Sequence, residues 1–116
     1  MVTTQGENMG LRKNELATVD PNMCDNGTVD AWRALNEAEL EAWRASDESK
    51  GIDCAGETKL PPRRKYFRLE AGQVVTVLKG RTAWHGDWGH PVRNMALIMT
   101  AHGEVLYARR KHLIAA

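Results

Sequence analysis

The chain has 116 residues, of which 42% are hydrophobic and 27% charged, and its formal net charge is +1. This length suits one domain, with room at most for an arm beside it. No apolar run approaches the roughly 18 residues that a membrane-spanning helix needs, and the first sixteen residues lack the basic start and apolar centre of a secretory signal. We therefore expect a cytoplasmic protein with no membrane partner.

The charges are distributed unevenly along the chain. Residues 1–57 contain five lysines or arginines and twelve acids, a net charge of −7, whereas residues 58–116 contain eleven and three, a net charge of +8. A basic half indicates a polyanionic partner, usually nucleic acid. The alternative is that the acidic half folds onto the basic half and neutralises it. Both can hold together if the acidic part competes for the basic site.

The N-terminal segment, residues 1–27, carries few large apolar side chains. It ends in DPNMCDNG, a run that is dense in turn-forming residues. We predict a flexible or loosely docked arm that becomes ordered only against a partner.

Residues 28–51 are predicted to form an acidic helix or helix pair. The phrase AWRA occurs twice, eleven residues apart, and eleven residues make about three helical turns, which places Trp32 and Trp43 on one face. Asn36 and Glu39 form the pattern of a capping box, which is a helix start signal. This second start favours two shorter helices that meet near residue 35.

Residues 52–65 are predicted to be a basic linker. Pro61 and Pro62 cannot continue a helix and impose an extended backbone. Three cations follow the prolines directly, namely Arg63, Arg64 and Lys65. A stiff spacer therefore delivers three positive charges to one place.

From residue 66 onward the hydrophobic residues recur with the period of two that is typical of strands. The predicted strands include GQVVTVLKG, VRNMALIMT and VLYA, and the last two are joined by a tight hairpin at His102-Gly103 with positive φ at both residues. Because the connections are short, we expect antiparallel strands that close into a small barrel. The predicted core contains Phe67, Leu69, part of Val74–Leu78, Ala96, Ile98, Val105, Tyr107 and Leu113.

The segment from Tyr66 to Ala116 resembles SH3-like small barrels, including the KOW-type barrels of ribosomal and transcription-elongation proteins. The matching features are an aromatic residue and a leucine before GQVVTVLKG, a polar loop, a returning strand, a tight hairpin and the closing ARRKHLIAA. The resemblance implies a module that binds RNA, DNA or protein through its loops. The predicted fold class is therefore α+β, with an N-terminal acidic helical segment followed by an antiparallel SH3-like five-stranded small β-barrel over residues 66–116.

The same segment also resembles toxin endoribonucleases with SH3-like barrels. In those proteins a strand that ends in a Gly-rich loop precedes a sequence similar to HPVRNMALIM of this chain. This resemblance implies a nuclease site that contains Arg93, and it is kept as a remote alternative.

The loop TAWHGDWGHPVRN, residues 82–94, combines several residues that occur in metal and catalytic sites. His85, Asp87 and His90 are metal ligands by type, but no fourth ligand accompanies them. The two cysteines lack CxxC spacing, which favours free thiols. No serine-nucleophile motif is present, and no cysteine lies near a histidine. We therefore predict no metal, no cofactor and no enzymatic activity.

The predicted binding surface combines cations with loop tryptophans. Trp84 and Trp88 are expected to stack on bases while the cations contact phosphates. The candidate residues are Arg63, Arg64, Lys65, Arg68, Lys79, Arg81, Trp84, Trp88, Arg93, Arg109, Arg110 and Lys111. The predicted function is non-enzymatic binding of nucleic acid, with RNA or a single strand favoured. The alternative is an inhibitor or accessory factor that caps a partner protein, its acidic half acting as a charge mimic.

Overall fold

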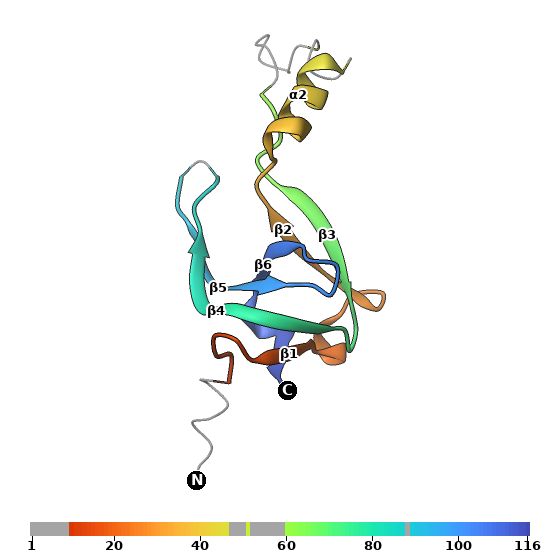
Figure 1. Cartoon of the computed structure of the whole chain (residues 1–116), viewed down its shortest axis with the longest axis vertical. Coiled ribbons are helices and arrows are strands. Elements are labelled where there is room, and N and C mark those ends of the chain that lie inside the picture. Colours follow the sequence, from red (N-terminus) through yellow and green to blue (C-terminus); the bar gives the residue numbers. More distant parts are fainter. Residues whose placement is uncertain (1–9, 47–50, 52–59, 88) are drawn as a thin grey trace. The chain divides into compact units, whose positions relative to one another are not determined.

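Figure 1 shows the whole chain as a computed structural model. The structure describes residues 10–46, 51, 60–87 and 89–116. The chain divides into two compact units, which we call the sheet unit (residues 1–33 and 66–116) and the helix unit (residues 34–65). Within the described ranges there is no helix with the length and apolar character that crossing a bilayer demands.

The described strands form a single, mostly antiparallel sheet of seven strands. In chain order they are β1 (Leu16–Val19), β2 (Thr28–Arg33), β3 (Lys65–Glu70), β4 (Val74–Trp84), β5 (Val92–Met99), β6 (Val105–Arg109) and β7 (Leu113–Ala115). Their order across the sheet is β3-β2-β6-β5-β4-β1-β7. Two short 3-10 turns accompany them, η1 (Pro21–Met23) and η3 (Arg110–His112), and the latter carries the chain from β6 to β7.

The short connection between β3 and β4 forces the sheet to curve. These strands lie four positions apart in the sheet order, which in a flat sheet is about 19 Å. Four residue steps join Glu70 to Val74 and reach at most about 14 Å. A hydrogen bond of 2.9 Å from Gln73 N to Glu70 O shortens the path further. The sheet therefore curls so that this turn bridges its two sides (Figure 1).

The apolar core lies on the inner face of the curled sheet. Its main cluster draws buried residues from every strand and includes Leu69, Val75, Val77, Ala96, Ile98 and Leu113. A second cluster is formed by Trp32, Trp84 and Met95. The period-two pattern predicted six residues of this core correctly, namely Leu69, Val75, Val77, Ala96, Ile98 and Leu113. It gave the wrong phase for β6, in which Leu106 and Ala108 are buried while the side chain of Val105 is 41% exposed.

The predicted α+β fold with an N-terminal helical segment and a five-stranded SH3-like barrel is wrong. Residues 66–116 do contribute most of five strands, but β3 is bonded only to β2, and β7 only to β1. The segment therefore does not close on itself. Instead the acidic half supplies β1 and β2 to an open sheet, so that the expected arm contains a strand that lies between β4 and β7.

The predicted helix over residues 28–51 is replaced in part by a strand. Residues 28–33 form β2, in which Ala31 is opposite Ala108 and Trp32 is opposite Tyr107 of β6. Thr28 and the valine that follows are β-branched, which favours a strand. Burial of Trp32 against the sheet overrides the helical spacing of the two AWRA phrases.

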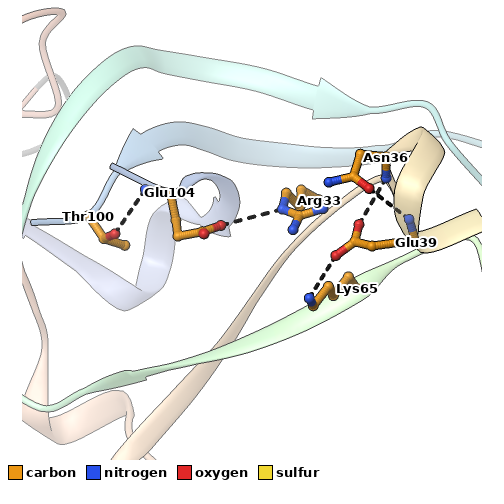
Figure 2. Close-up of polar contacts among 6 residues, drawn as sticks. All are labelled: Arg33, Asn36, Glu39, Lys65, Thr100 and Glu104. Carbon is orange, nitrogen blue, oxygen red and sulfur yellow. Dashed lines mark hydrogen bonds and ion pairs between the residues drawn. The ribbon is translucent and has the colours of Figure 1, made fainter. Parts of the chain in front are cut away.

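The second predicted helix start is confirmed. In α2 (Glu37–Ala45) the Asn36 side chain accepts a hydrogen bond of 2.8 Å from Glu39 N, and the Glu39 carboxylate accepts one of 2.9 Å from Asn36 N. The other oxygen of Glu39 pairs with Lys65 Nζ at 2.7 Å (Figure 2). Within the helix unit, the capping-box pattern in the sequence therefore predicts correctly where α2 begins.

The strict alternation predicted for VRNMALIMT is broken by a β-bulge. Between the pairs Thr82–Met95 and Trp84–Val92, β5 advances by three residues while β4 advances by two. The extra residue falls beside Asn94, whose φ of 60° is in the left-handed region that asparagine tolerates. Two neighbouring residues of β5 are consequently exposed together.

The hairpin between β5 and β6 is present, but with a different turn from the one predicted. Gly103 N donates to Thr100 O at 2.9 Å, and of the two residues predicted to have positive φ only Gly103 does, at 85°. This is the pattern of a three-residue loop that ends in a left-handed glycine.

We expect Trp32→Ala to lower the free energy of unfolding by about 3–5 kcal/mol, because a fully buried tryptophan leaves a large cavity. Trp32 is 1% exposed, whereas Val74 is 49% exposed, so Val74→Ala should change the same quantity by less than about 0.5 kcal/mol. Urea unfolding measures both. If Trp32→Ala fails to fold, Trp32→Phe should give a smaller loss, and an unchanged midpoint for it would contradict the burial.

Candidate functional site

The sheet unit contains an open pocket that is lined by five cationic side chains. Its volume is about 810 Å³, and its cations are Arg81, Arg93, Arg109, Arg110 and Lys111. The other lining residues are Gly10, Leu11, Asn94, Leu113, Ile114 and Ala115, so that no carboxylate is among the described residues that line it. The lining is therefore strongly positive and also has an apolar part, formed by Leu11, Leu113 and Ile114, which we call the apolar wall.

The five cations come from consecutive parts of the sheet. Arg81 lies on β4, Arg93 on β5 and Arg109 at the end of β6, and these three strands are neighbours. The η3 turn then carries Arg110 and Lys111 from β6 toward β7, which is at the far edge beyond β1. The curvature of the sheet and the path of η3 thus bring together charges that are up to thirty residues apart in sequence.

The β-bulge in β5 presents two side chains to the pocket instead of one. Arg93 and Asn94 are consecutive and both exposed, while Met95 and Ala96 after them are both buried. In a regular strand one member of each neighbouring pair would face the core. The bulge therefore places a guanidinium and an amide side by side in the lining, as bulges at binding sites often do.

Arg110 is fixed in place by the backbone of β4. Its Nε donates to Gly80 O at 2.6 Å. A Cβ on Gly80 would overlap the carbonyl oxygen of Leu11, so the segment that precedes β1 packs directly on β4 at this point. Burial, and secondly the nearby charge of Arg81, lowers the pKa of the Arg110 guanidinium. The pocket therefore holds like charges close together.

Arg109 lies against a cluster of aromatic side chains. Its guanidinium carbon lies 5.4 Å from the centroid of the Trp32 ring, a cation–π geometry. Trp32 meets Trp84 edge to face at 6.4 Å, and Trp84 meets Tyr107 in the same way at 5.2 Å. This packed aromatic cluster therefore holds the side chain of one pocket cation in position.

The expectation of an exposed, base-stacking ring is wrong for Trp84. Its side chain is 4% exposed, and its Nε1 donates to Asp87 Oδ1 at 2.8 Å. A Cβ on Gly86 would overlap the same ring, so the loop folds back against the tryptophan. Trp84 thus anchors the loop from inside. Trp88 lies outside the described residues.

The remaining predicted site residues do not line the pocket. Arg68 is exposed on β3 and Lys79 is exposed on β4. The other three, Arg63, Arg64 and Lys65, belong to the helix unit, where Lys65 pairs with Glu39. The structure thus brings together five of the predicted cations and leaves five others outside the lining.

Some lining residues were missed by sequence reasoning. Leu11, Asn94 and Ile114 form the apolar and amide parts of the wall. The asparagine at position 94 was the one available signal, because asparagine is common at the left-handed residue of a bulge. Leu11 and Ile114 reach the pocket only through pairing of distant strands, which no local pattern reveals.

A separate polar network on the sheet unit ties β2 to the β5–β6 hairpin. Arg33 Nε lies 3.4 Å from Glu104 Oε2, and Glu104 N donates to Thr100 Oγ1 at 3.2 Å (Figure 2). The Arg33 guanidinium also lies over the Phe67 ring at 5.3 Å. This arginine is therefore held by its own neighbours and serves the fold.

The described residues of the His-Asp-His loop are used for packing and hydrogen bonding. Across the described ranges, no group of three or more histidine, cysteine, aspartate or glutamate side chains is close enough together to hold an ion. Asp87 instead accepts the hydrogen bond from Trp84. The chemistry that the described residues do assemble is the cationic pocket.

No protein-family model, curated protein or solved structure matches this chain. The resemblance to SH3-like and KOW-type barrels therefore stays a prediction.

We expect the protein to lose stability as the pH falls below about 6.5, and His112 to contribute to this loss. Its Nδ1 is buried with no hydrogen-bond partner among the described residues. Burial first, then Lys111 and Arg109, lower its pKa from 6.5, while Asp30 opposes them. The unfolded chain therefore binds this proton at a higher pH than the folded chain does, which destabilises the fold on acidification.

Urea unfolding at about pH 7.5 and 5.5 measures this loss. His112→Gln should reduce the difference between the two free energies of unfolding. His102→Gln, in the exposed hairpin turn, is the control and should leave the difference as in the parent protein. An equal loss in the parent and in His112→Gln would contradict the assignment.

Proposed function

We propose that this protein is a non-enzymatic nucleic-acid-binding protein that acts in the cytoplasm and holds the phosphates of RNA or of a single strand in its cationic pocket. The observation that carries the proposal is the convergence of five cations on one pocket whose described lining contains no acid. Such a pocket has a strongly positive electrostatic potential, which attracts polyanions. Phosphates are the anions that arginine binds with the best geometry.

Four of the five cations that line the pocket have no ion-pair partner among the described residues. Within the described part of the chain, no ion pair engages Arg81, Arg93, Arg109 or Lys111. Repulsion between Arg81 and Arg110 is strong enough to contribute to the lowered pKa of the latter. A bound polyanion would relieve this repulsion, so that the arrangement favours the occupied state.

The apolar wall supports a single strand or RNA loop over a regular duplex. Ile114 is 46% exposed beside the cations, and Leu11 and Leu113 also line the pocket. Unstacked bases offer flat apolar faces and hydrogen-bonding edges, which a duplex keeps inside. The apolar wall can receive such a face, and the Asn94 amide can bond to a base edge.

The composition of the lining supports binding over catalysis. Its charged members are four arginines and one lysine, and neither residue type is a usual general base or general acid near neutral pH. A ribonuclease needs a general base and a general acid that titrate in that range, usually histidine or a carboxylate. The pocket can therefore hold a phosphodiester, and its described lining supplies no group to cleave it.

We expect Arg93→Glu to weaken binding of a labelled single-stranded RNA by at least about tenfold, because it replaces a phosphate contact with repulsion. Arg93 is exposed and makes no hydrogen bond or ion pair within the described residues, so the fold should survive the change. Fluorescence anisotropy across a salt series measures it. The slope of log affinity against log salt should become shallower by about 0.7–1.

Lys13→Glu is the matched control, since it makes the same change in net charge at an exposed turn outside the lining. It should weaken binding by less than about threefold, because Lys13 does not line the pocket and salt screens an exposed charge. Equal losses in the two variants would show that net charge, not the pocket, attracts RNA. Failure to bind any nucleic acid at low salt, with Arg93-dependent capture of a protein instead, would contradict the proposal and favour the capping alternative.

A further inference from the structure

The number of cations in the pocket exceeds what an internal stretch of a strand would require. A volume of about 810 Å³ lies within the range of small-molecule sites, about 300–1,000 Å³. A nucleic-acid backbone carries one negative charge per nucleotide, and a pocket of this size admits only a few nucleotides. An internal stretch of a nucleic-acid strand would therefore bring fewer negative charges into the pocket than the five positive charges that line it.

We propose that the pocket recognises a chain of adjoining phosphates attached to a nucleoside, as in a 5′-di- or triphosphate. This inference rests on the proposed function and names the part of the nucleic acid that the pocket selects. The terminal phosphate carries a charge of about −1.5 to −2 near pH 7, and each further phosphate adds one more. Such a group concentrates its negative charge over a distance that suits one pocket.

The placement of the cations suits several phosphates in a row. Arg81, Arg93 and Arg109 come from three neighbouring strands, and η3 adds two more charges toward β7. Each guanidinium can bond two oxygens of a phosphate with its planar fork. Arginines that come from different strands can contact different phosphates of the same chain.

Two of the arginines are already held in position before any ligand binds. Arg109 lies over Trp32, and Arg110 donates to the Gly80 carbonyl. Fewer rotamers are therefore lost on binding, which raises affinity for a compact anion. The apolar residues Leu11 and Ile114 lie in the same lining, where they can contact the base that follows the phosphates.

The shared chemistry has two sources, the 5′ end of an RNA or a free nucleotide, and the test separates them. One RNA sequence is prepared with a 5′-triphosphate, a 5′-monophosphate or a 5′-hydroxyl end, and the full chain is titrated with each in the presence of EDTA. The triphosphate RNA should bind at least about tenfold more tightly than the hydroxyl RNA, with the monophosphate between them. ATP should compete with the triphosphate RNA, and AMP should compete far less.

Matched variants show whether the pocket makes this selection. Arg93→Ala should reduce the ratio of triphosphate to hydroxyl affinity, and Arg93→Lys, which keeps the charge and loses the fork, should restore it in part. Lys13→Ala should leave the ratio unchanged. Inorganic triphosphate should compete less well than ATP, because it lacks a base for the apolar wall. Equal competition by the two would overturn the assignment to a nucleotide.

The outcomes distinguish this inference from the proposed function. Equal affinity for the three RNA ends would overturn the inference and leave RNA binding intact. Binding of ATP but of no RNA would support the phosphate-chain pocket and contradict the proposed function. Binding of neither would overturn both.

Discussion

The pairing of β1 with both β4 and β7 is the interaction on which the rest of the sheet unit depends. β1 has only four residues, yet it is hydrogen-bonded on both sides. β7 has no other partner in the sheet order. Because η3 runs from β6 to β7, the position of Arg110 and Lys111 follows from this pairing. Leu11, which precedes β1, packs on Gly80 of β4 and also lines the pocket. A strand from the acidic half thus helps to shape a pocket whose cations all come from the basic half.

Such a concentration of positive charge is tolerated because the fold holds two of the arginines in place and leaves two others exposed to water. The Gly80 carbonyl binds Arg110, and the Trp32 ring supports Arg109. Arg81 and Arg93 remain exposed, where water solvates their charge. Glu104, an acid of the sheet unit, pairs with Arg33, and neither residue lines the pocket. This structural ion pair is therefore separate from the cations of the pocket.

Local signals in the sequence predicted local structure, and they did not predict long-range pairing. The capping box at Asn36 determines where α2 begins, because both of its hydrogen bonds lie within four residues. The two AWRA phrases are identical, yet one lies in β2 and the other in α2. Their difference comes from β6, which is more than seventy residues from the first phrase. The cations of the candidate site could be predicted from the sequence. Which of these cations line the pocket depends on the bulge at Asn94 and on the curvature of the sheet.

Trp32 links the stability of the sheet unit to the geometry of the pocket. Its ring meets the buried Trp84 and the exposed Tyr66 edge to face, and Arg109 of the pocket lies over the same ring. Because Trp84 in turn holds Asp87, the same cluster orders the start of the loop between β4 and β5. Packing in the interior therefore restrains both a pocket cation and the neighbouring loop. Trp84, which the sequence suggested as a ligand contact, instead packs inside the molecule against Trp32, the ring over which Arg109 lies.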